Sequence, residues 1–171
     1  MEKYRDNFKT YLKDLGAKKP SPGGGSAAAL SACIGISLIE KAINYSAKDR
    51  KFLKEIRLLN SLRNKALICV DSDGEIFEKV MQSKGKKRLF FLSKSNALVV
   101  DLGNICVRVS CLAKKVESGI KKSIISDFYT GLNFIRVSLK ACIYNLKDNS
   151  RILGKPERSI NVFKRHLKAG V

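Results

Sequence analysis

The chain has 171 residues, of which 44% are hydrophobic and 29% are charged, a balance that fits one folded domain and excludes a disordered tail. It carries 34 Lys and Arg against 15 Asp and Glu, so its formal charge is +19 and an acidic partner is favoured over a basic one. Lysine supplies 24 of these cations, and lysine is poor at bidentate recognition of bases or phosphates. We therefore interpret the positive charge in the first place as that of a solvated surface.

The cysteines and the apolar stretches indicate the compartment. The five cysteines are odd in number, form no Cys-x-x-Cys pair and stand beside aliphatic residues, so we expect reduced core thiols, a cytoplasmic location and no metal site. Residues 1–8 are charged and lack the apolar run of a secretory signal. The longest apolar stretch, 27–39, is interrupted by Ser and Gly and is shorter than the ~20 residues of a membrane span. We expect a buried helix there and no membrane partner.

The first two predicted helices are separated by a loop. Residues 4–15 carry apolar side chains at helical spacing, and Gly16 ends this helix. The segment 19–25, KPSPGGG, cannot continue it, because two prolines lack donors and three glycines carry a large entropy cost in a helix. Ser26 can then cap a second helix over 27–47, which is apolar on nearly every side and should lie at the centre of the fold.

The third predicted helix is long and amphipathic, and Asp49 can cap it. Its apolar stripe is interrupted by a carboxylate at Asp73. Residues 84–88, KGKKR, are expected to form a turn. A fourth helix follows, in which apolar residues step by fours and threes over 98–116 until Gly119 ends it.

Two more helices complete the chain. Ser126 can cap the fifth, where apolar residues over 128–146 alternate in steps of four and three, as in a bundle helix. Gly154 breaks the chain, and a final short helix covers 160–167. Since no segment alternates polar and apolar residues as a strand would, we predict an all-α protein, an antiparallel bundle of five to six helices.

The predicted bundle is a single domain over residues 1–171, with 151–171 as a short basic C-terminal helix. The second helix, 27–47, is apolar all round and offers more surface than one thin bundle can cover. We therefore expect a homodimer.

The glycine-rich loop before the second helix is a candidate ligand site. It is not a Walker A loop, because no Gly-Lys-Ser/Thr follows, and it is not a G-x-G-x-x-G turn after a strand. A glycine loop that opens a helix presents free N–H groups, which could bind a carboxylate, a phosphate or a polar heterocycle. At Gly24 a Cβ would clash with such a ligand or meet a strained φ angle. A tight turn that lets two helices pack closely explains the same loop equally well.

Single titratable residues give further candidates. Asp73 on an inward stripe would suit a general acid or base, although a polar residue facing a wet groove gives the same pattern. Asp127 lies in a first helical turn, where the dipole favours a carboxylate without any function. His166, the only histidine, is expected on the surface. The lysine clusters lack interleaved aromatic residues, so nucleic-acid binding is not favoured.

Three blocks carry a resemblance to a known family: PSPGGGSAAAL at 20–30, DSDGEIFEKVM at 71–81 and SDFYTGLNFIRVSLKACIYNL at 126–146. In order and spacing they resemble the cyclodeaminase/cyclohydrolase family, which comprises the C-terminal domain of formiminotransferase-cyclodeaminase and stand-alone methenyltetrahydrofolate cyclohydrolases. The resemblance implies an all-helical, usually dimeric enzyme with a folate site in a cleft near the dimer interface.

The resemblance also implies roles for residues. Asp73 and Phe77 match the family's Asp-x-x-x-Phe element, and Ser126 with Asp127 matches its Ser-Asp element. Asp73 would be the catalytic acid or base, either protonating departing ammonia or activating the attacking water. No cofactor is implied beyond the tetrahydrofolate substrate, whose polyglutamate tail the lysine clusters could attract. The implied substrate-binding residues are Gly23, Gly24, Gly25, Ser26, Ser126, Asp127 and Asn145.

Two departures from the family pattern support an alternative. Ile120 follows Gly119 where family members carry Gly-Asn, and Ala141 replaces the first Asn of Asn-Val-x-Ile-Asn-Leu, so that only Asn145 remains. A lost polar ligand leaves its buried partner unpaired at a cost of about 1–3 kcal/mol. The alternative is a catalytically decayed helical protein of the same scaffold that binds an acidic ligand or nucleic acid.

Overall fold

The computed structural model describes residues 4–47 and 51–169, and every regular element in these two ranges is helical. The prediction of an all-α bundle of five to six helices is confirmed. The helices are α1 (Tyr4–Leu15), α2 (Gly24–Ser46), α3 (Leu53–Gln82), α4 (Gly85–Val116), α5 (Ile125–Leu153) and α6 (Ser159–Lys168). Two 3-10 turns, Glu117–Gly119 and Lys122–Ile124, connect α4 to α5.

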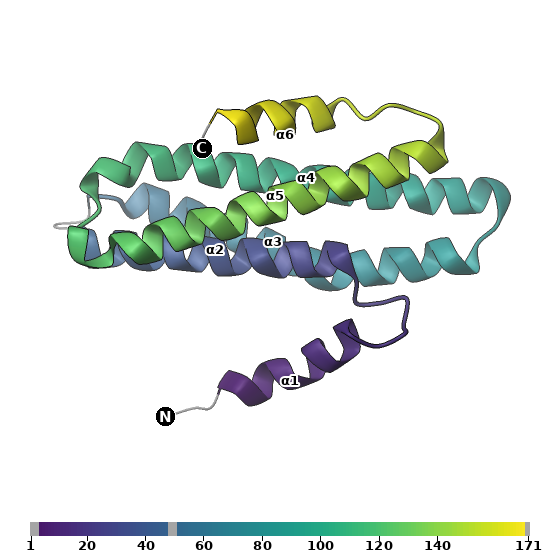
Figure 1. Ribbon diagram of the computed structural model, residues 1–171, viewed down its shortest axis with the longest axis horizontal. Helices are drawn as coiled ribbons and strands as arrows, with labels where there is room; N and C mark the ends of the chain where they lie inside the picture. Colours follow the sequence, from purple (N-terminus) through teal and green to yellow (C-terminus); the bar gives the residue numbers. More distant parts are fainter. Residues whose placement is uncertain (1–3, 48–50, 170–171) are drawn as a thin grey trace.

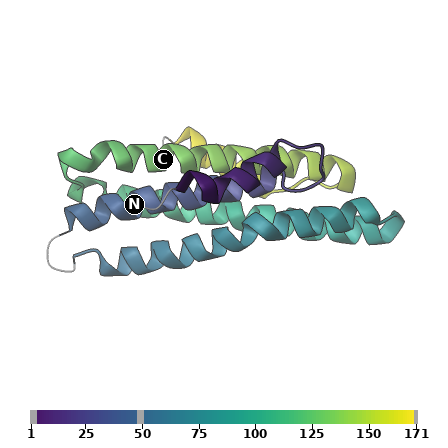
Figure 2. The ribbon, with the colours of Figure 1, turned by 90° about the horizontal axis from the view of Figure 1, so that it is seen from below.

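Four long helices, α2 to α5, form the body of the molecule. Each packs against the next in the chain, and α5 closes the group by packing against α2 (Figures 1 and 2). The core consists of their inward faces, to which α6 adds one aromatic ring. Its largest fully buried side chains are Ile36, Ile39, Ile43, Leu59, Leu62, Val109, Val116, Phe128, Ile135, Leu139, Leu146 and Phe163.

Helices α2 and α5 approach each other closely, because glycine faces glycine. A Cβ atom on Gly35 would lie 2.7 Å from the carbonyl oxygen of Gly131, and one on Gly131 would lie 2.8 Å from the carbonyl oxygen of Gly35. The small residues of α2 therefore allow it to lie at the centre, where half of its residues are buried. This agrees with the central position predicted for the second helix.

Three predicted helix starts are corrected by the structure. Ser26 is not a cap, because α2 begins at Gly24 and its first-turn N–H at Ser26 is bound by Asp73 of α3 instead. Ser126 does not cap α5, which begins at Ile125 directly after a 3-10 turn. The turn expected over 84–88 is shorter, because Gly85 takes a left-handed φ of 51° and α4 starts there. The proposed cap Asp49 lies outside the described residues.

The two terminal helices differ in how they dock. Phe163 of α6 is fully buried and packs against Gly103 of α4, where a Cβ atom would meet its ring at 2.2 Å. Helix α1 lies apart from the bundle in Figure 1. Its apolar residues Tyr4, Phe8 and Leu12 are 66%, 43% and 60% exposed, whereas Tyr11 and Leu15 of the same predicted stripe are half-buried.

Two stretches, α2 and residues 85–119, are long and apolar enough to cross a membrane by length and composition alone. Both are central to the bundle, with 56% and 50% of their most apolar windows buried inside the protein. Core helices pass the same test, so this is weak evidence for a span.

The cysteines follow the core prediction with one exception. Cys33, Cys69, Cys106 and Cys142 are buried free thiols, and burial raises the pKa of Cys33 to about 11 and that of Cys106 to about 12. Cys111 is exposed on the outer face of α4, so its expected core position is wrong.

Candidate functional site

A cleft of about 340 Å³ lies at the end of the bundle where α2 begins. Its walls come from the start of α2, the second half of α3, the first half of α4 and the last turns of α5. The structure here brings together five residues that the sequence singled out: Gly23, Gly24, Gly25, Asp73 and Asn145. The other lining residues are Pro20, Phe77, Val80, Met81, Arg88, Leu92, Ser95, Val99, Asp148, Asn149 and Ile152.

Asp73 stands against the first turn of α2. Its Oδ2 accepts a hydrogen bond from the backbone N–H of Ser26 at 3.0 Å, so a side chain of α3 satisfies one of the free donors of another helix. The side chain is half-buried, and this desolvation raises the pKa of the carboxyl group, while the bond from Ser26 opposes the rise. Asp73, the carboxylate predicted on an inward stripe, therefore lines the cleft and also contacts the start of α2.

The three loop glycines have different surroundings. A Cβ atom on Gly25 would lie 2.2 Å from Oδ1 of Asp73, so only glycine lets this carboxylate approach the helix. At Gly23 and Gly24 a Cβ atom would have nothing within 4 Å, and neither residue has a positive φ. The strained φ considered for Gly24 is therefore not present, and the close approach is at Gly25.

Ser26 is fully buried behind the cleft and does not line it. Its hydroxyl and the phenol of Tyr11 share a hydrogen bond of 3.1 Å, which ties α1 to α2. The backbone N–H of Ser26, rather than its side chain, takes part in the site.

The cleft contains polar groups that sequence reasoning missed. Among the described residues that line it, Arg88 is the only Lys or Arg, and Asn149 and Ser95 line it together with Asn145. Arg88 belonged to the KGKKR run that was interpreted as a solvated turn. Because α4 already begins at Gly85, Arg88 falls in a helical turn at the cleft, and only the correct helix start could have indicated this.

Ser126 and Asp127 lie at the opposite end of α5. About 19 residues at 1.5 Å each separate Ser126 from Asn145, or roughly 28 Å along the helix. Oδ2 of Asp127 binds Nζ of Lys41 at 2.6 Å, a contact that raises the pKa of Lys41. Within one chain the Ser-Asp element is therefore remote from the cleft.

His166 was expected on the surface, and this is wrong. It is half-buried on α6, and its Nε2 is buried without a hydrogen-bond partner in the described structure. Desolvation lowers its pKa. It does not line the cleft.

The arrangement can perform acid–base chemistry on a partly apolar ligand. Phe77, Val80 and Leu92 offer apolar contact, while the N–H groups of Gly24 and Gly25 have no partner within their helix. The Asp73 carboxyl group, whose pKa is raised by desolvation, lines the same cleft as Asn145 and can accept or donate a proton there.

Comparisons with known proteins confirm the resemblance stated from the sequence. The family model of formiminotransferase-cyclodeaminase matches residues 7–89. A methenyltetrahydrofolate cyclohydrolase of Methylorubrum extorquens is 30% identical over 87 residues, which are 47% of this chain and 42% of that protein. The match therefore spans less than half of the relative's length.

The fold matches more completely than the sequence. The crystal structure of formiminotetrahydrofolate cyclodeaminase from Thermotoga maritima superposes with a TM-score of 0.80 at 17% identity, covering 94% of this chain and 86% of that one. The sequence match to the family includes the glycine loop, Asp73 and Arg88, and ends before Ser126 and Asn145.

Proposed function

We propose, from the confirmed likeness to the formiminotransferase-cyclodeaminase family, that this protein is an enzyme acting on a tetrahydrofolate that carries a one-carbon unit. The observation that carries the proposal is the joint lining of one cleft by Asp73, the start of α2 and Asn145. A pterin ring has the flat shape and the polar edge that such a cleft can bind.

Cyclohydrolase activity is the form that we favour, because the relative with the greater sequence identity carries that name. In this reaction water attacks the methenyl carbon between N5 and N10, and Asp73 accepts a proton from the water. The new hydroxyl group loses its remaining proton as the bond from the carbon to N5 breaks, so that a formyl group stays on N10. Of the two protons lost by the water, one ends on N5 and the other is released to solvent. The carboxyl group can return the proton that it accepted, so it acts as base and then as acid.

Arg88 gives the cleft a cation for an acidic part of the ligand. No carboxylate of the described residues lies within 4.0 Å of its guanidinium group. Its planar fork suits a carboxylate such as that of the glutamate portion of a folate. We assign it to substrate binding and not to the chemical step.

The decisive experiment follows the absorbance of methenyltetrahydrofolate with purified protein, corrected for the spontaneous reaction. A cyclohydrolase lowers the absorbance when methenyltetrahydrofolate is supplied. A cyclodeaminase raises it when formiminotetrahydrofolate is supplied, and releases ammonia at the same rate. If the protein changes neither substrate, the proposal is wrong, and the hypothesis of a non-catalytic binding protein with the same fold is favoured.

A further inference from the structure

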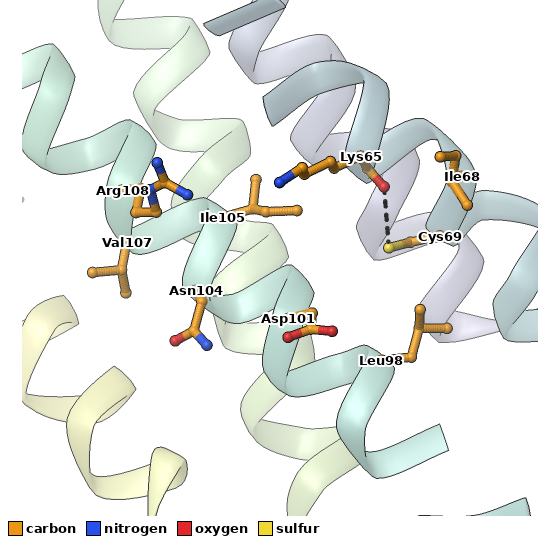
Figure 3. Close-up of a pocket in the computed structure, with 9 residues that line it drawn as sticks. All are labelled: Lys65, Ile68, Cys69, Leu98, Asp101, Asn104, Ile105, Val107 and Arg108. Carbon is orange, nitrogen blue, oxygen red and sulfur yellow. Dashed lines mark hydrogen bonds between the residues drawn. The ribbon is translucent and has the colours of Figure 1, made fainter. Parts of the chain in front are cut away.

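A second cavity, larger than the candidate cleft, lies between α3 and α4 (Figure 3). We call it the α3–α4 groove. Its volume is about 720 Å³, against about 340 Å³ for the cleft, and it holds none of the residues that the sequence predicted for a site. Its apolar surface comes from Ile68, Cys69, Leu98 and Ile105. Ile68 is 66% exposed, which leaves apolar surface in water.

Two cations from opposite walls line the groove. Lys65 comes from α3 and Arg108 from α4, and no carboxylate of the described residues lies within 4.0 Å of either charged group. In Figure 3 the Lys65 side chain extends toward α4, on the side of Ile105 where Arg108 lies. Asp101 lies nearer Leu98, so the two signs of charge occupy different parts of the groove.

We propose that the α3–α4 groove is a second ligand site, for an organic anion whose carboxylate, sulfonate or phosphate is attached to an apolar or aromatic body. An anion between Lys65 and Arg108 would relieve the repulsion of two cations that line one space, and the guanidinium fork can bind it with two hydrogen bonds. The apolar body would cover Ile68 and Leu98 and remove them from water.

The groove is separate from the cleft, and no described residue lines both. Cys69 and Leu98 line the groove and also a small void of about 10 Å³, which Asp73 and Asn145 line from the other side. A void of this size holds at most one water molecule, so no ligand passes between the two sites. The inference therefore does not depend on the proposed function.

The test uses 8-anilinonaphthalene-1-sulfonate, an aromatic anion whose fluorescence rises on apolar surface. We expect saturable binding to the wild type that weakens at high salt. The double variant K65Q/R108Q should raise the dissociation constant at least tenfold. The control K121Q/K122Q loses the same charge away from the groove and should change it less than twofold.

A second pair of variants tests the apolar part. I68N and L67N change neighbouring exposed residues of α3, but only Ile68 lines the groove. I68N should weaken dye binding about fivefold, and L67N and the cleft variant D73N should leave it unchanged. Circular dichroism confirms that each variant is folded. Absence of saturable binding to the wild type, or equal effects within either matched pair, overturns the proposal.

Discussion

Asp73 is the residue on which the chemistry depends, because it is the titratable group that meets the start of α2 inside the cleft. Asp73→Asn keeps the shape of the side chain and removes the exchangeable proton. We expect the chemical rate to fall by roughly 10²–10⁴ while substrate binding is retained. Single-turnover kinetics on methenyltetrahydrofolate measure this, and a wild-type rate in the variant would refute the role.

The same variant should be more stable than the wild type at neutral pH. Burial raises the folded-state pKa of Asp73 above the unfolded value of about 3.9, so the folded state binds more protons between these two values. As pH rises through this window, the wild type loses stability that Asp73→Asn does not lose. The melting temperatures should nearly coincide near pH 3 and differ at pH 7, with the variant higher. A difference independent of pH would mean that desolvation of the carboxylate is not the cause.

Gly24 and Gly25 form a matched pair that separates ligand binding from packing. Gly25→Ala would bring a Cβ atom to 2.2 Å from Asp73 Oδ1, so the carboxylate must move, at a cost of about 1–3 kcal/mol of folding free energy. Gly24→Ala meets nothing within 4 Å and should leave the melting temperature unchanged or slightly higher. If Gly24 borders bound folate, its variant should raise KM without loss of stability. Equal stability of the two variants would contradict this account.

Arg88 and Lys87 are neighbours of equal charge, of which only Arg88 lines the cleft. Arg88→Gln should raise KM for the folate substrate about tenfold, as expected for one charge-assisted hydrogen bond of about 1.5 kcal/mol, with kcat within twofold. Lys87→Gln should change neither constant by more than twofold. Steady-state kinetics at fixed ionic strength decide between recognition by Arg88 and general attraction by the surface charge, for which the two variants would behave alike.

Among single residues, the sequence predicted the positions that follow from the periodicity of a helix alone. Asp73 was identified because an apolar position carried a carboxylate, and the structure places it at the cleft. Arg88 was missed because its position depends on where α4 begins, which Gly85 decides by its left-handed backbone. Gly24 was chosen over Gly25 because sequence cannot show which glycine faces the side chain of another helix.

At the scale of elements, the helices were predicted because their apolar spacing is regular and because Gly16 and Gly154 end two of them. The helix starts were predicted less well. A cap predicted from local sequence assumes that a neighbouring side chain accepts the hydrogen bond from the first-turn N–H group. In α2 the N–H of Ser26 donates instead to Asp73, which lies 47 positions later in the chain. Tertiary contacts of this kind leave no local signal.

Helix α6 offers a test of docking by a single side chain. A ten-residue helix is marginal in isolation, and Phe163 is its one buried residue. Phe163→Ala should remove most of the docking free energy, about 3 kcal/mol or more, and hydrogen exchange over α6 should become fast. Val162→Ala, a change at the exposed neighbour, should cost less than about 0.5 kcal/mol. Retained protection of α6 in Phe163→Ala would show that other contacts hold the helix.

At the scale of the whole molecule, two apolar surfaces of the described residues are incompletely covered. Tyr4, Phe8 and Leu12 of α1 are exposed, and Leu30, Ile34 and Leu38 of α2 are only half-buried. The family-derived site residues are also divided, since Asp73 lies at one end of the bundle and Asp127 at the other. A two-fold axis across the bundle would bring opposite ends of two chains together.

We therefore propose a homodimer that joins these surfaces, with a mass of about twice 19.0 kDa by sedimentation or light scattering. Phe8→Glu with Leu12→Glu should shift the protein toward monomer, because both side chains lie on the exposed stripe of α1, whereas Lys9→Glu should not. A second experiment tests whether Asp127 of one copy completes the cleft of the other, in which case Asp73→Asn and Asp127→Asn proteins should each lose activity. When the two variants are unfolded, mixed and refolded together, up to about a quarter of the wild-type activity should return, because half of the dimers are then mixed and one of the two sites in each mixed dimer is intact. A strict monomer at micromolar concentration would exclude the dimer, and a dimer without regained activity would place Asp127 outside the site.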